Sequence, residues 1–175
     1  MIEGRALISN IEQTRKKLAD LGAAFNSNYA FKDIIFVPKK AECNLSDDFL
    51  RVRVYTKNNW PTKKVVLVRK QTEFKDTGKI DNIILKKEFD AEQEAVDFVA
   101  TELETEFERG FEYEREGWQY DFGKHRIFVE DIKGYKPSIE IEADSEEIES
   151  LFTKIGVIEK IRVSIPEVMR RILKR

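Results

Sequence analysis

Apolar and polar residues alternate along several short stretches of the chain. The segment 49–55 reads Phe-Leu-Arg-Val-Arg-Val-Tyr, and the segment 138–142 reads Ser-Ile-Glu-Ile-Glu. Successive side chains of a β-strand point to opposite faces of the sheet, so residues i and i+2 share a face. The alternation therefore predicts two half-buried strands. In the first strand Arg51 and Arg53 share the polar face, and in the second strand two glutamates share it.

The same placement of charges on one strand face recurs along the sequence. Such pairs are Glu3 with Arg5, Lys86 with Glu88, and Glu140 with Glu142. An open sandwich would turn these charged faces to water. A closed barrel, with its apolar side turned outward against helices, would instead have a charged interior. Such an interior would suit a polyanion bound by Arg and Lys, together with a divalent cation bound by carboxylates.

The pattern predicts more strands than helices. Strands are predicted at 2–8, 29–37, 49–56, 64–69, 83–89, 111–117, 118–122, 126–131 and 138–143. Helices are predicted from an N-cap at Ser9 to Leu21, and over about 91–108, 145–155 and 165–174. Runs of strands without strand–helix–strand alternation favour an antiparallel sheet, open or closed. Because no segment resembles a linker, we expect one α+β domain over residues 1–175.

Composition narrows the range of functions. Charged residues make up 37% of the chain, yet 31 basic residues nearly balance 33 acidic ones. This balance argues against a nucleic-acid-binding protein. The single Cys43 and the single His125, which is expected in a surface turn, exclude a disulfide and cysteine- or histidine-rich metal sites. No apolar run has the length of a membrane span and no signal peptide is recognisable, so we expect a cytoplasmic protein.

Several ordered motifs resemble one known family. They are Met1-Ile2-Glu3-Gly4-Arg5, Asp33 with Phe36, Leu50-Arg51-Val52-Arg53, Val66-Leu67-Val68-Arg69, Lys86-Lys87-Glu88, Arg115 and the run Val129–Glu142. Together they resemble the CYTH group, also called triphosphate tunnel metalloenzymes, over nearly the whole chain. The group includes class IV adenylyl cyclases, thiamine triphosphatases and inorganic triphosphatases. The resemblance implies a closed antiparallel β-barrel of about eight strands, with a charged tunnel and with helices packed outside.

The resemblance also implies roles for charged residues. The expected substrate-binding residues are Arg5, Arg51, Arg53, Arg69, Lys86 and Arg115. The expected ligands of Mg²⁺ or Mn²⁺ are Glu3, Glu88, Glu130, Glu140 and Glu142. The alternative for these glutamates is that they form structural ion pairs with the arginines. For Arg69 the strand register is open, since Lys70 follows it directly and points to the other face.

Three functional hypotheses remain at this stage. The first is metal-dependent processing of a triphosphate, either hydrolysis or cyclisation of ATP, with ATP, thiamine triphosphate and tripolyphosphate as candidate substrates. The second is a catalytically degenerate tunnel that binds a phosphorylated ligand without turnover. It is favoured by Met1, which stands where the family has its first glutamate. The third is a structural or interaction protein. We expect neither a nucleic acid nor a membrane as partner, and a homodimer is left open.

Overall fold

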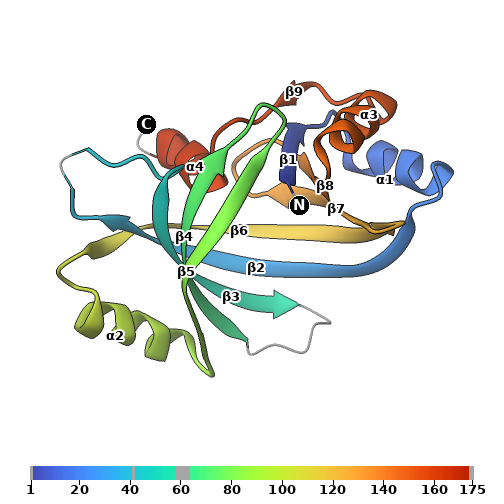
Figure 1. Ribbon diagram of the computed structural model, residues 1–175. Coiled ribbons are helices and arrows are strands. Elements are labelled where there is room, and N and C mark those ends of the chain that lie inside the picture. Colours follow the sequence, from blue (N-terminus) through green and yellow to red (C-terminus); the bar gives the residue numbers. More distant parts are fainter. Residues whose placement is uncertain (1, 41, 58–63, 174–175) are drawn as a thin grey trace. The chain divides into compact units, whose positions relative to one another are not determined.

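The computed structural model describes residues 2–40, 42–57 and 64–173 (Figure 1). The strands are β1 (Ile2–Leu7), β2 (Ala24–Pro38), β3 (Asp48–Lys57), β4 (Val65–Phe74), β5 (Lys79–Phe89), β6 (Phe107–Phe122), β7 (His125–Ile132), β8 (Ser138–Ala143) and β9 (Glu159–Lys160). The helices are α1 (Ile11–Asp20), α2 (Glu92–Glu102), α3 (Ser145–Ile155) and α4 (Ile165–Leu173). None of these helices is long and apolar enough to span a membrane.

The strands form one sheet in the order β5-β4-β3-β2-β6-β7-β8-β1-β9. β5 also pairs with β1, where Lys79 lies opposite Glu3, so the pairings of β1 to β8 close into a ring. The pairs β3–β4, β6–β7, β7–β8 and β1–β8 are antiparallel. The predicted α+β class, with an antiparallel sheet of about eight strands that closes on itself, is therefore confirmed.

The chain divides into two compact units. The first contains Met1–Ala30, Phe74–Ile80 and Arg115–Arg162, and the second contains Phe31–Glu73, Asp81–Glu114 and Val163–Arg175. Strands β2, β4, β5 and β6 contribute residues to both units. Each unit has its own hydrophobic core, and each is described separately below. A single domain over residues 1–175 stays a prediction.

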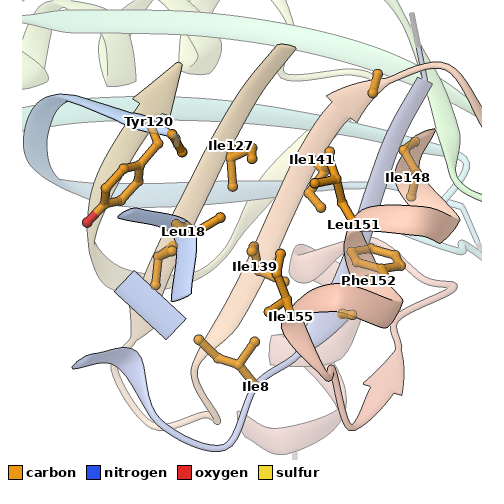
Figure 2. Close-up of a cluster of buried hydrophobic side chains, with 14 residues drawn as sticks. Ile8, Leu18, Tyr120, Ile127, Ile139, Ile141, Ile148, Leu151, Phe152 and Ile155 are labelled. Atoms are coloured by element: carbon orange, nitrogen blue, oxygen red, sulfur yellow. The ribbon is translucent and has the colours of Figure 1, made fainter. Parts of the chain in front are cut away.

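In the first unit, helices α1 and α3 cover the apolar face of β1, β7 and β8 (Figure 2). Ile139 and Ile141 of β8 are fully buried in this core, where they join Ile127 of β7 and Leu151 of α3. Because side chains alternate along a strand, the glutamates of β8 lie on the opposite face. The apolar face is thus turned to the helices, as the sequence pattern predicts.

In the second unit, helix α2 covers the apolar face of β3. Leu50, Val52 and Val54 pack with Val99 of α2 in a separate core. The arginines between them in sequence therefore lie on the other face of β3. Burial of apolar area stabilises each unit by about 25 cal/mol per Å², and this sets which face of each strand carries the charges.

Several predicted boundaries are wrong. Strand β2 begins at Ala24, β4 continues to Phe74, β5 begins at Lys79, and β9 was not predicted. The segments 111–117 and 118–122 are not two strands but parts of one continuous strand, β6. Gly117, the last residue of the first predicted segment, lies inside the strand, at a point where the Tyr29 side chain packs onto its backbone. The helix predicted over 91–108 ends at Glu102, because the chain turns after it and enters β6 at Phe107.

Smaller predictions also need correction. Helix α1 is capped by Asn10, whose side chain accepts a hydrogen bond from the backbone N–H of Gln13, and not by Ser9. His125 is not a surface residue of a turn but a buried residue of β7, and its Nε2 lies 3.0 Å from the Glu147 carboxylate. Met1 and the segment Asn58-Asn59-Trp60-Pro61, whose residue types predict a turn, lie outside the described residues.

Candidate functional site

The predicted site residues of β1, β7 and β8 lie on the face of the sheet that is opposite to the helices. In the antiparallel pairing of β1 with β8, Glu3 lies opposite Glu142 and Arg5 lies opposite Glu140. Side chains directly opposite each other on antiparallel strands share a face and are close neighbours. The register therefore brings together four of the residues predicted from the sequence, three of them as metal ligands and one as a substrate ligand.

Arg5 is a buried basic residue of this face with three hydrogen-bond partners. Its side chain is 8% exposed and donates hydrogen bonds to Glu130 at 2.5 Å, to the Ser138 hydroxyl at 3.0 Å and to Glu140. Burial alone would lower the pKa of Arg5, but the carboxylates of Glu130 and Glu140 outweigh it and raise that pKa. Arg5 is thus a permanent cation held between two strands.

Glu130 of β7 is the matching acidic centre. It is buried, and it accepts hydrogen bonds from Arg115 at 3.0 and 3.2 Å and from the Tyr29 hydroxyl at 2.7 Å. Burial would raise the pKa of Glu130, but the guanidinium groups of Arg115 and Arg5 hold it well below its ordinary value. Burial and the same carboxylate raise the pKa of Tyr29. The carboxylate therefore stays ionised at neutral pH, and the phenol stays a donor.

The remaining carboxylates of this face are also paired. Glu3 accepts a hydrogen bond from Lys79 at 2.5 Å, and Glu142 lies 2.5 Å from Arg126. Burial raises the pKa of Glu142; Arg126 opposes this shift, whereas the neighbouring charges of Glu140 and Glu3 add to it. The three glutamates are therefore crowded and repel each other, and a bound cation would relieve this repulsion.

Carboxylate oxygens are the donors that Mg²⁺ and Mn²⁺ prefer, so Glu3, Glu140 and Glu142 fit such a metal by chemistry. Among the residues that the structure describes, however, no group of three or more His, Cys, Asp or Glu side chains is arranged as a metal site. The arrangement instead corresponds to the alternative of ion pairs between glutamates and basic side chains. Metal binding would require these glutamates to exchange some of their present partners.

The second unit holds another arginine cluster. Asp33 of β2 is fully buried and accepts two hydrogen bonds from Arg53, at 2.7 and 2.8 Å. The Nε atom of Arg51 lies 3.8 Å from the same carboxylate. The guanidinium of Arg53 also lies 3.5 Å from the centre of the Phe31 ring, a cation–π contact. Asp33 thus fixes the orientation of the two predicted phosphate ligands.

The register of β3 with β4 settles which face Arg69 occupies. Arg69 pairs with Leu50, whereas Lys70 pairs with Phe49, which shares the face of Arg51. Arg69 therefore lies on the face opposite to that of Arg51, and its guanidinium donates two hydrogen bonds to Asp48, at 2.9 and 3.1 Å. On β4, Lys70 is the basic residue that shares the face of Arg51.

The last two predicted residues lie on β5. Lys86 and Glu88 are exposed, and Lys86 Nζ lies 3.9 Å from Glu88 Oε1. Their roles as substrate and metal ligands stay predictions, as do those of the other site residues.

Several residues of these clusters were missed by sequence reasoning. Lys79 was assigned to a loop, Tyr29 to a strand without a role, and Asp33 only to a family motif. For Asp33 the sequence did carry a signal, because a carboxylate directly before the apolar run Ile34–Val37 is expected to be buried with a partner. For Tyr29 and Lys79 the sequence held no comparable signal, since their partners are distant in the chain.

Comparison with protein-family models gives no match, and comparison with curated proteins gives no significant match. Solved structures do match. The PH1819 protein of Pyrococcus horikoshii is 18% identical, with a TM-score of 0.77 and 99% of each chain covered. A candidate adenylyl cyclase of Hippeastrum, described as having a dominant triphosphatase activity, is 16% identical, with a TM-score of 0.71, covering 97% of this chain and 95% of that chain.

The fold also occurs outside proteins named as enzymes. The Mediator head module of Schizosaccharomyces pombe contains a chain that is 12% identical, with a TM-score of 0.54, covering 91% of this chain and 96% of that chain. At such low identities the likeness concerns the fold and not the activity. The resemblance to the CYTH group is confirmed at the level of the fold, because this chain shares the fold of a structure described as an adenylyl cyclase candidate with triphosphatase activity.

Proposed function

We propose that this protein binds and processes a triphosphate compound. The observation that carries the proposal is the polar face of the first unit, where Arg5, Lys79 and Arg126 lie among the carboxylates of β1 and β8. The description of the Hippeastrum neighbour as a triphosphatase supports the same chemistry. The proposed substrates are ATP, thiamine triphosphate or tripolyphosphate.

The basic residues would bind the phosphate oxygens. Guanidinium groups form paired, charge-assisted hydrogen bonds with phosphate, and an ammonium group acts as a compact point charge. Lys79 and Arg126 now neutralise Glu3 and Glu142. An arriving triphosphate would compete for these side chains, and the glutamates that it releases would become available to a cation. Arg51 and Arg53 of the second unit are proposed as phosphate ligands in their own right.

Glu3, Glu140 and Glu142 would hold Mg²⁺ or Mn²⁺. Such a cation neutralises phosphate charge and stabilises the charge that develops at the reacting phosphorus. The chain's own contribution is to place three carboxylates on one face of two paired strands, beside the arginine that would bind the phosphates. Hydrolysis and cyclisation both need this arrangement, and a turnover assay separates them.

Binding without turnover is the second candidate. One observation favours it: each carboxylate of the proposed metal set in the first unit is already paired with a basic side chain. In that case the protein would bind a phosphorylated ligand through its basic residues and would lack an effective metal site.

The test combines binding with turnover. Calorimetry is performed with ATP, thiamine triphosphate and tripolyphosphate, and phosphate release and cyclic AMP are measured with Mg²⁺ and with Mn²⁺. We expect Lys79→Ala and Arg126→Ala each to weaken binding about tenfold, the equivalent of one charged hydrogen bond. The matched control is Lys16→Ala, because Lys16 is exposed on α1 and pairs only with the neighbouring Asp20 in the contacts described.

The outcomes separate the two candidates. Binding together with phosphate release or cyclic AMP formation supports processing of a triphosphate. Binding that depends on Lys79 and Arg126, with no product under either metal, supports the second candidate. A wild-type protein that binds none of the three compounds would reject both.

A further inference from the structure

Glu130 has no oxygen lone pair left for a metal. A carboxylate offers about four acceptor sites on its two oxygens. Oε1 accepts from the Tyr29 hydroxyl at 2.7 Å and from Arg115 at 3.2 Å. Oε2 accepts from Arg5 at 2.5 Å and from Arg115 at 3.0 Å. The four contacts fill the four sites, and the residue is 4% exposed.

The same contacts bring two guanidinium groups together around one carboxylate. Arg5 and Arg115 are both buried. Their positive charges repel each other, and the charge of Arg115 acts to lower the pKa of Arg5. Two like charges in a buried place are unfavourable unless a counter-charge lies between them. Glu130 is the counter-charge that both arginines share, and Glu140 is a second counter-charge on Arg5.

We propose that Glu130 is a positioning residue, which fixes the guanidinium groups of Arg5 and Arg115 for an anionic ligand, and that it is not a ligand of the divalent cation. This assignment rests on the proposed function, because the anion is the triphosphate. It replaces the role that the sequence resemblance implies for Glu130. It leaves Glu3, Glu140 and Glu142 as the proposed metal ligands.

A tyrosine and a glycine complete the support of Glu130. In the pairing of β6 with β7, Gly117 lies directly opposite Glu130. A Cβ atom added to Gly117 would lie 2.4 Å from the Cζ and hydroxyl oxygen of Tyr29. The missing side chain thus makes room for the Tyr29 ring to lie over β6 with its hydroxyl at the carboxylate. A glycine inside a strand often marks such a close approach.

Arg5 keeps donors for a ligand. A guanidinium group has five N–H donors. The contacts to Glu130, Ser138 and Glu140 account for three of them. Glu130 accepts a hydrogen bond from one N–H group of Arg5 and so orients the planar guanidinium. The remaining N–H groups therefore point in a fixed direction. A guanidinium group with a fixed orientation binds phosphate more strongly than a mobile one, since less side-chain entropy is lost on binding.

The experiment measures metal binding and anion binding separately in the chain of 175 residues. Mn²⁺ alone is titrated by calorimetry, and tripolyphosphate is titrated in EDTA. We expect Glu130→Gln, which keeps the shape but loses the charge, to weaken tripolyphosphate binding about tenfold and to change Mn²⁺ affinity less than about twofold. The matched variant Glu142→Gln should weaken Mn²⁺ binding at least as strongly and tripolyphosphate binding less.

Two milder variants distinguish a specific effect on anion binding from a general loss of structure. Tyr29→Phe removes only the hydroxyl, and Gly117→Ala displaces the ring that carries it. Both should weaken tripolyphosphate binding in EDTA while leaving Mn²⁺ affinity unchanged, a split that general loss of structure would not produce. Unchanged tripolyphosphate affinity in all three variants would overturn the positioning role.

The outcomes also separate this inference from the function on which it rests. If Glu130→Gln weakens Mn²⁺ binding as much as Glu142→Gln does, Glu130 is a metal ligand and the inference is wrong. If the wild type binds Mn²⁺ but no tripolyphosphate, the proposed function and the anion-positioning role fail together. In that case the Mn²⁺ titration still decides whether Glu130 is a metal ligand. If the wild type binds neither probe, both are rejected.

Discussion

At the scale of single residues, Glu130 gives the chain a specific response to acid. Burial opposes its ionisation, but Arg115 and Arg5 hold its pKa below the ordinary value of 4.5. In the unfolded chain the carboxylate titrates near that value. As the pH falls below about 4.5, the unfolded state therefore takes up the proton first. The stability that Glu130 contributes is complete above this pH and is lost as the pH falls towards the folded-state pKa.

We therefore expect Glu130→Gln to lower the free energy of unfolding at pH 7, and the difference from wild type to shrink as the pH falls below about 4.5. Urea unfolding at pH 7 and at about pH 3 measures both values. Val99→Ala, which removes only buried apolar atoms, serves as the control for a general effect of acid. A difference between Glu130→Gln and wild type that is the same at both pH values would contradict the assignment.

Arg51 and Arg53 share a strand face but should differ in their contribution to stability. Arg53 makes two hydrogen bonds to the fully buried Asp33, whereas the Nε atom of Arg51 lies 3.8 Å from the same carboxylate. Loss of Arg53 removes two charged hydrogen bonds from the buried Asp33 carboxylate, so we expect Arg53→Ala to lower stability by about 2–3 kcal/mol. Arg51→Ala should lower it by about 1 kcal/mol or less. Urea unfolding of both variants tests the order, and a larger loss for Arg51→Ala would contradict it.

At the scale of elements, helix α3 packs onto the backbone of β1 at Gly4. A Cβ atom at this position would lie 2.5 Å from Cγ2 and 3.3 Å from Cδ1 of Ile148. We expect Gly4→Ala to destabilise the chain by about 1–3 kcal/mol, because overpacking forces the helix or the side chain to move. The third close atom is Cζ of Phe152, at 3.3 Å. In an Ile148→Ala background, which removes the two contacting atoms of Ile148, the same substitution should therefore cost less. Thermal unfolding of the four variants measures this coupling, and additive effects would contradict the contact.

Helix packing also explains which strand faces carry the charges. In β1, β7 and β8 the apolar residues are buried under α1 and α3, and in β3 they are buried under α2. Because the period of a strand is two residues, burial of one face leaves every intervening residue on the other. The polar faces that hold Arg5 and Arg53 therefore follow from the packing of the helices. No separate signal in the sequence is needed for them.

At the scale of the whole molecule, the closed ring of strand pairings distinguishes this chain from an open sandwich. A ring leaves no long unpaired edge among its members, which removes a route to edge-to-edge aggregation. The fold alone does not decide between catalysis and binding, since it also occurs in the Mediator head module. Activity must therefore come from the side chains placed on the ring, and the binding and turnover tests address those side chains.

The sequence by itself determined the strand parity. The alternation at 49–55 and 138–142 correctly assigned Arg51, Arg53, Glu140 and Glu142 to the faces opposite the hydrophobic cores, because a strand's period is a local property. The same local logic located the segment of α3 and its end at Gly156, whose positive φ of 75° suits glycine. The motif order also indicated the fold correctly.

Only the tertiary structure decided which charges meet. The face of Arg69 depends on the register of β3 with β4, and the partner of Glu3 depends on the pairing of β1 with β5. The support of Glu130 by Tyr29 joins residues 101 positions apart, and the saturation of its oxygens is visible only when all its donors are placed. Local periodicity fixes the face on which a side chain lies. The register between distant strands and the packing of helices fix its neighbours, and those neighbours decide whether a glutamate can bind a metal or holds an arginine in place.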